Sequence, residues 1–154
     1  MSTPPRSPHP MQDAPQDLAT RVLSIIGYIL GISYPLLALS TGARGFYQYC
    51  CRADLTNKTG PLISVFTAIL YVLAAVGFFK RTPRWWRISV GVLSIELSFV
   101  LVIGTLSYLM PDLIGDTAWQ HFGQDYGFFP LLQPLLGLIY LLWKPTRRAF
   151  GLIA

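Results

Sequence analysis

Apolar residues are concentrated in four long runs along the chain, and most of the charged residues lie between or outside them. The runs cover residues 18–39, 62–79, 88–110 and 128–143. A membrane hydrocarbon core about 30 Å thick requires about 20 helical residues at about 1.5 Å each. The first three runs meet this length, whereas the fourth is short and spans only with little tilt. The pattern therefore predicts four membrane-spanning helices.

The predicted fold class is all-α, a polytopic membrane four-helix bundle formed by residues 18–143. Residues 1–17 contain five prolines and almost nothing apolar to bury, so we predict a disordered, proline-rich cytoplasmic tail. Residues 144–154 carry several basic side chains and are predicted to form a cytoplasmic C-terminus. The sequence thus predicts one membrane domain between two polar ends.

The composition supports a membrane protein. Of the 154 residues, 53% are hydrophobic and 12% are charged, whereas a soluble domain has about 25% charged residues to keep its surface wetted. The net charge of +5 arises from short flanks between apolar runs, and a nucleic-acid groove needs a continuous basic face. We therefore expect the lipid bilayer, and no nucleic acid, as a partner.

The distribution of basic residues predicts the orientation of the chain. Nine of the twelve lie in the N-terminal tail, the second loop and the C-terminus, while Arg44, Arg52 and Lys58 lie in the first loop. Because positive charge is retained in the cytoplasm, both termini are predicted to be cytoplasmic. Aromatic residues of the first and third loops are predicted to form an outer interface belt. They are Phe46, Tyr47, Tyr49, Trp119, Phe122 and Tyr126.

Small residues recur at helical spacing in two runs, and such residues allow membrane helices to approach closely. The first run contains Gly27 and Gly31 in a Gly-x-x-x-Gly motif. The third run contains Gly91, Ser94 and Ser98. Packing of the first helix against the third is the preferred interpretation of these two stripes, and a seam between two copies of the chain is the alternative.

One acidic residue, Glu96, lies in the middle of the third run. An ionised carboxylate at that depth costs at least ~2.5 kcal/mol, and the central parts of the runs contain no Lys, Arg or His. Burial therefore favours the neutral form of the carboxyl. On a helical wheel Glu96 shares a face with Ser89, Ile103 and Ser107, away from the small-residue stripe.

An intramembrane polar site is predicted around Glu96. Tyr28 and Tyr71 lie at similar depth in the first two runs, and Gln133 lies in the fourth. Acidic residues inside membranes often mark proton or ion pathways. The other interpretation is a protonated carboxyl that forms a hydrogen bond between helices, or a carboxyl that contacts a basic residue of another subunit. Gln133 is expected to stabilise the packing, either by satisfying a carbonyl freed by a proline or by bonding another helix.

Two adjacent cysteines, Cys50 and Cys51, are predicted on the outer side. Neighbouring cysteines form only a strained ring, and the chain lacks the Cys-x-x-Cys pair of a thiol oxidase, so we expect interfacial thiols or a bridge to another chain. The third loop contains Asp112, Asp116, His121 and Asp125, but their spacing follows no known metal-site pattern. We predict no catalytic residue, no metal, no cofactor and no enzyme activity.

Three segments, GPLISVFTAILYVLA, GTLSYL and FGQDYGFFPLLQPLLGL, together resemble uncharacterised small four-helix integral membrane proteins of high-GC Gram-positive bacteria. The resemblance covers roughly residues 18–143. It implies a multi-pass protein of the bacterial plasma membrane, and it implies no activity, cofactor or partner.

The sequence therefore predicts an integral membrane protein of non-enzymatic type. The leading interpretation is an accessory or structural subunit that packs against other membrane proteins or against itself. Its aromatic outer loops and small-residue faces would supply the contact surface. The alternative is a small proton-coupled transporter or carrier in which Glu96 titrates.

Overall fold

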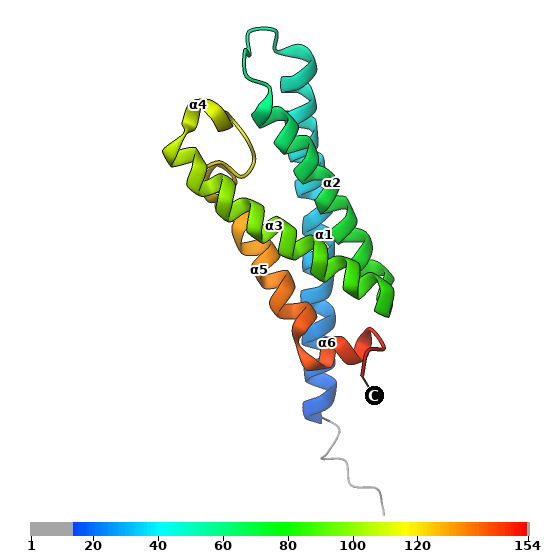
Figure 1. Ribbon diagram of the computed structural model, residues 1–154. Coiled ribbons are helices and arrows are strands. Elements are labelled where there is room, and N and C mark those ends of the chain that lie inside the picture. The colour runs from blue at the N-terminus through cyan, green and yellow to red at the C-terminus, as the bar shows by residue number, and fades with distance from the viewer. Residues whose placement is uncertain (1–13, 154) are drawn as a thin grey trace, which may run out of the picture.

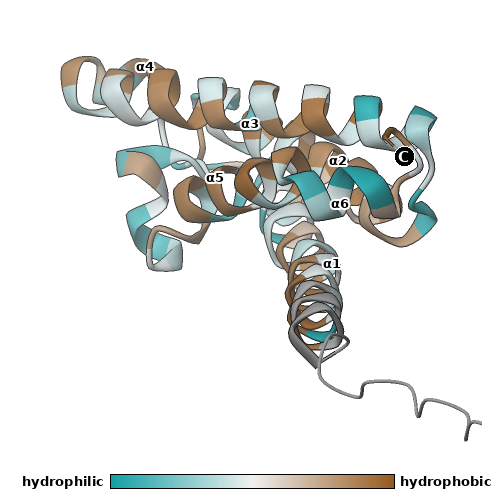
Figure 2. Cartoon of the chain, turned by 90° about the horizontal axis from the view of Figure 1, so that it is seen from below, coloured by the Kyte–Doolittle hydropathy of each residue, from teal (hydrophilic) through white to brown (hydrophobic). Residues whose placement is uncertain are grey.

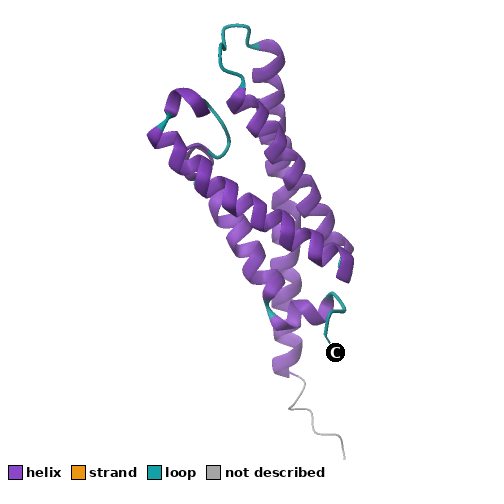
Figure 3. Ribbon diagram, viewed as in Figure 1, coloured by secondary structure: helices purple, strands orange, loops and turns teal. Residues whose placement is uncertain are grey.

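The computed structural model describes residues 14–153, which are helical almost throughout and contain no strand (Figures 1 and 3). The long helices are α1 (Ala14–Cys51), α2 (Thr59–Lys80), α3 (Pro83–Leu109) and α5 (Phe129–Leu142). The short ones are α4 (Pro111–Ile114), the 3-10 helix η1 (Gln120–Tyr126) and α6 (Lys144–Ala149). The predicted disordered tail falls on residues 1–13, which lie outside the described part, and on residues 14–17, which belong to α1.

Three helices are long and apolar enough to cross a membrane, namely residues Ser24–Cys51 of α1, all of α2 and all of α3. The fourth apolar run differs from a continuous span. Helix α5 has 14 residues, or about 21 Å at the usual helical rise, which is less than the hydrocarbon thickness. Helices η1 and α5 are together apolar enough to cross, but they meet at 98°. The all-α fold class is therefore confirmed, and three or four helical segments are long and apolar enough to span a membrane.

The backbone on both sides of α5 explains why this helix is short. Gly127 and Phe128 have φ of 59° and 62°, a left-handed conformation that cannot continue a helix. Pro130 follows in the first turn of α5, where proline is well tolerated. At the other end Trp143 is extended, and Pro145 is the second residue of α6. The fourth run is thus one helix between two changes of chain direction.

The helices pack in chain order around a shared core. Helices α1 and α2 form an antiparallel pair, α3 packs against α2, and α5 packs against α3, while α5 and α1 touch at few points (Figure 1). The start of α1, the turn between α2 and α3, and α6 lie together at one end of the molecule (lower in Figure 1). Helices α4 and η1 lie toward the other end.

The outer surface of the long helices is apolar, as lipid contact requires. Leu39 and Leu109 are 72% and 70% exposed. Figure 2 shows hydrophobic residues along the outside of α3 and α5, whereas hydrophilic residues collect on α6 and at the start of α3. An exposed apolar area of this extent is not found on soluble monomers, so it supports a membrane-embedded protein.

The segment between α3 and α5 is attached to the helices by hydrogen bonds. The backbone N–H of Ala118 donates to Ser64 Oγ of α2 at 3.2 Å, and the N–H of His121 donates to Ser107 Oγ of α3 at 2.8 Å. Each bond joins residues more than a dozen positions apart. The segment is therefore part of the packed structure and not a free loop.

Trp119 in this segment lies in the protein interior. Its side chain is fully buried, with its ring centroid 5.7 Å from that of Phe99. The prediction that Trp119 belongs to the outer aromatic belt is therefore wrong, because the attached segment turns the indole inward. Phe46 and Tyr47 of the predicted belt are exposed.

Gly60, at the start of α2, tests how closely this segment must pack. A Cβ at position 60 would overlap the carbonyl oxygen of Asp116 and lie 2.8 Å from its carbonyl carbon. Because these are backbone atoms, they cannot rotate away. Gly60→Ala should lower the free energy of unfolding by about 1–3 kcal/mol, as overpacking does elsewhere. Unfolding of the purified protein in detergent measures this loss.

Gly91→Ala is the matched control, because a Cβ there meets no atom within 4 Å. Alanine is favoured over glycine within helices by up to about 1 kcal/mol, so Gly91→Ala should leave stability unchanged or raise it. Equal stability of the two variants would contradict the close packing of residue 116 on α2.

Candidate functional site

Glu96 is the middle residue of α3, about 20 Å along the helix from either end. Its side chain has no exposed surface. Ser89, Ile103 and Ser107, which the helical wheel places on the same face, are buried as well. This face of α3 therefore points into the protein, and the carboxyl lies where the helices meet.

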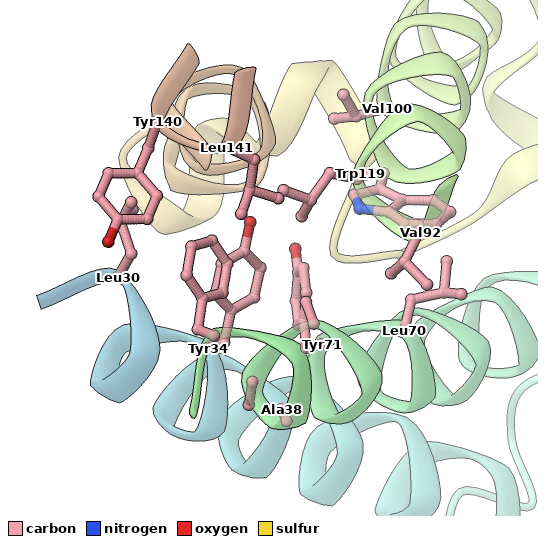
Figure 4. Close-up of a cluster of buried hydrophobic side chains, with 14 of the residues drawn as sticks. Leu30, Tyr34, Ala38, Leu70, Tyr71, Val92, Val100, Trp119, Tyr140 and Leu141 are labelled. Atoms are coloured by element: carbon pink, nitrogen blue, oxygen red, sulfur yellow. The ribbon is translucent and has the colours of Figure 1, made fainter. Parts of the chain in front are cut away.

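Two tyrosines from neighbouring helices lie near the carboxyl. Tyr34 of α1 and Tyr71 of α2 are both fully buried, and their ring centroids are 5.8 Å apart. Figure 4 shows both hydroxyls directed from α1 and α2 into the space in front of α3 and α5. The Glu96 carboxyl is close enough to interact electrostatically with both phenols.

The position of Glu96 on α3 agrees with this placement. Val92 and Val100, one helical turn before and after it, enter the same cluster in Figure 4. Residues four apart on a helix share a face, so the carboxyl projects between these two valines toward the tyrosines. We refer to Glu96, Tyr34 and Tyr71 as the polar triad.

The polar atoms of the triad have no hydrogen-bond partner within the described residues. This holds for both carboxyl oxygens of Glu96 and for the hydroxyls of Tyr34 and Tyr71. The indole N–H of Trp119 points toward the Tyr71 hydroxyl in Figure 4 and lies near it, without the geometry of a hydrogen bond. An unsatisfied buried polar group costs about 1–3 kcal/mol. The triad therefore concentrates unused hydrogen-bonding capacity at the centre of the molecule.

The chemistry of the triad depends on a neutral carboxyl. Among the side chains that the structure describes, ion pairs join Arg44 to Asp125 and Arg52 to Asp54, and Glu96 takes part in none. An ionised Glu96 would be a buried charge without a counter-ion, which is strongly unfavourable. A protonated carboxyl and two phenols each supply one O–H donor and acceptor oxygens.

Gln133 and Tyr28, the other two predicted members of the site, lie elsewhere. Gln133 of α5 donates through Nε2 to Ser33 Oγ of α1 at 2.8 Å, so it links two helices that otherwise touch little. Tyr28 is 56% exposed, and its ring lies 5.5 Å from the guanidinium of Arg81. The structure thus brings Tyr71 to Glu96, uses Gln133 as an interhelical bond, and leaves Tyr28 outside the site.

Two central residues are missing from the predicted site. Tyr34 continues the buried stripe of α1 that runs through Gly27, Gly31 and Ala38, so its inward position was available from the 3.6-residue period. Trp119 follows a polar loop sequence without periodicity, and its burial depends on hydrogen bonds to other helices. No local signal identifies it.

The two predicted small-residue stripes do not face each other. Gly27 and Gly31 are buried on α1, and a Cβ at position 31 would lie 3.3 Å from the Phe79 ring of α2. Gly91 and Ser94, like Ser98, are exposed on the outside of α3. The glycines of α1 therefore pack toward α2 and α5, and the preferred packing of the first helix on the third through these stripes is not formed.

The thiols and the acidic residues form no further centre. Cys50 and Cys51 are free and exposed at the end of α1. Among residues 14–153 no three His, Cys, Asp or Glu side chains gather closely enough to hold a metal ion.

The chain matches no family model, no curated protein and no solved structure. The resemblance to small membrane proteins of high-GC Gram-positive bacteria therefore stays a prediction. Function has to be inferred from the residues themselves.

Replacing Trp119 tests whether the segment between α3 and α5 closes the core above the triad. Trp119→Ala should destabilise the protein by about 3–5 kcal/mol, as for other buried aromatic truncations. Trp143→Ala is the control, since Trp143 is 46% exposed, and it should cost much less. Near-UV circular dichroism during thermal unfolding in detergent compares them. A Trp119 variant as stable as the Trp143 variant would contradict the burial described here.

Proposed function

We propose that the protein is a non-enzymatic subunit of the bacterial plasma membrane that packs against other membrane proteins through the outer face of α3. The observation that carries this proposal is the exposed series Gly91, Ser94, Ser98 and Thr105, which we call the α3 face. Small residues of this kind permit close helix contact in lipid.

The hydroxyls of the α3 face are already satisfied within the helix. Ser94 Oγ donates to the carbonyl of Val90 at 2.7 Å, Ser98 Oγ to that of Ser94 at 2.8 Å, and Thr105 Oγ1 to that of Leu101 at 2.8 Å. The face is therefore compatible with lipid while the subunit is alone. Because its side chains are small, the face also allows a helix of a partner protein to approach closely.

The arrangement of the ends supports the proposed topology. The start of α1, the turn from α2 to α3, and α6 share one end of the molecule (Figure 1). In the sequence these regions carry eight of the twelve basic residues, and the ninth residue assigned to this side, Arg6, lies outside the described residues. The positive-inside rule assigns this end to the cytoplasm, with both termini and a four-helix bundle oriented accordingly.

Widening the α3 face should separate the subunit from its partner. Ser94→Leu with Ser98→Leu removes the close approach, while Ser40→Leu changes an exposed serine of α1 in the same way. Purification from native membranes in mild detergent, followed by native mass spectrometry, measures the partner retained. We expect one stoichiometric partner or second copy with wild type and Ser40→Leu, and at least about tenfold less with the double variant. Recovery of wild type as a lone monomer would refute the proposal.

The second candidate is a small proton-coupled carrier that uses the polar triad. A specific observation favours it: a fully buried carboxyl and two buried phenols lie together without partners. Intramembrane acids of this kind are usually retained for proton or ion movement. In this case Glu96 would take up and release the proton, and the two tyrosines would orient it.

Proton movement through Glu96 is directly measurable. Proteoliposomes that contain a pH-sensitive dye should show proton entry under an imposed pH gradient, and Glu96→Gln should abolish it because the amide cannot carry the proton. Ser89→Ala, on the same buried face, removes a hydroxyl that has no hydrogen-bond partner among the described residues and should leave entry within about twofold of wild type. Proton entry that survives Glu96→Gln would rule this candidate out.

A further inference from the structure

At the end of the molecule that holds α6, a small polar pocket lies beside a long apolar groove. The pocket has a volume of about 210 Å³ and is lined by Gly27, Tyr28, Phe78, Phe79 and Arg81. The groove has a volume of about 740 Å³ and lies between α1 and α5. Its wall consists of Ile26, Ile29, Leu30, Leu136, Ile139, Tyr140, Leu142 and Trp143.

The pocket and the groove meet at Gly27 and Tyr140. A Cβ at position 27 would overlap the Tyr140 hydroxyl and would lie 3.4 Å from Nη2 of Arg81. The absence of a side chain on Gly27 thus brings a phenol O–H and a guanidinium to the same point on α1. One ligand with a polar head and an apolar tail can occupy both spaces.

Arg81 has an unusual backbone for its residue type. It ends α2 in the left-handed conformation, with φ of 36° and ψ of 43°, where glycine is the common residue. Arginine at such a position is a strained choice, and strain of this kind is found where a side chain has a function. The backbone conformation directs the guanidinium back toward α1.

The guanidinium of Arg81 is partly buried and lies 5.5 Å from the centroid of the Tyr28 ring. Among the side chains that the structure describes, the ion pairs of Arg44 and Arg52 leave Arg81 without an acidic partner. A guanidinium presents a planar fork of N–H donors that matches a phosphate group. The pocket therefore offers positive charge and donors to an anion.

We propose that the pocket and groove bind one anionic phospholipid, with its phosphate at Arg81 and Tyr140 and an acyl chain along the groove. The groove is apolar, and its volume lies within the range that is usual for ligand sites, about 300–1,000 Å³. The positive charge of the Arg81 guanidinium in the pocket favours an anionic headgroup over a zwitterionic one. The site is separate from the α3 face and from Glu96.

Native mass spectrometry of the full chain tests the site. The protein is delipidated in detergent and offered equal amounts of phosphatidylglycerol and phosphatidylcholine. Wild type should retain one phosphatidylglycerol with about tenfold preference, the ratio that about 1.4 kcal/mol provides. Arg81→Gly should lose that preference. Arg84→Ala removes one charge from the same turn and should keep it.

Stability measurements separate a binding role from a structural one. Arg81→Gly should unfold at the same or a higher temperature than wild type without lipid, because glycine suits the left-handed position. Phosphatidylglycerol should raise the unfolding temperature of wild type and not that of Arg81→Gly. Ile139→Trp, which fills the groove from its exposed side, should also weaken retention.

Three results would overturn the proposal. One is unchanged phosphatidylglycerol preference in Arg81→Gly. Another is an equal loss in Arg84→Ala, since this indicates diffuse surface charge. The third is protection of wild type by inorganic phosphate equal to that by phosphatidylglycerol, because the site would then take a free anion.

Discussion

The desolvation of one carboxyl determines how the helices are turned. Glu96 lies in the middle of the third apolar run, residues 88–110. A carboxyl at that depth cannot face hydrocarbon without a large cost in free energy. Its face of α3 must therefore point inward, which leaves the opposite, small-residue face outward. The inward face is met by Tyr34 of α1 and Tyr71 of α2. Gly137 of α5, where a Cβ would lie 3.3 Å from the Tyr34 hydroxyl, lets the fourth helix close over them.

A second constraint, the length of α5, explains the segment between α3 and α5. Because α5 is about 9 Å shorter than a hydrocarbon core, it cannot cover the whole length of α3. The buried Trp119 and the hydrogen bonds of Ala118 and His121 fill the remaining part of the interior. A loop that packs inside membrane depth must satisfy its backbone groups within the protein, and these bonds contribute to doing so.

Much of the architecture could be predicted from periodicity and length. The apolar runs identify the long helices. The helical wheel of residues 88–110 places Glu96 and the small residues on different faces, and in the structure the Glu96 face is buried and the small-residue face is exposed. The predictions that were wrong concern features that depend on tertiary contacts. Which face of α3 meets α1 cannot be decided from small residues alone, because such residues serve equally at an internal or an external contact. Trp119 also lacked a local signal. Its burial depends on the hydrogen bonds of the nearby residues Ala118 and His121, whose partners lie 54 and 14 positions away in the sequence.

Helix α3 carries an inward acid and an outward small-residue face, and both functions that we propose depend on it. The most direct test is photo-cross-linking in native membranes from a reactive residue placed at position 98, compared with position 40 of α1. We expect a discrete protein adduct from position 98 and only lipid adducts from position 40. Lipid adducts alone from both positions would contradict the account, because the outward face of α3 would then meet no protein.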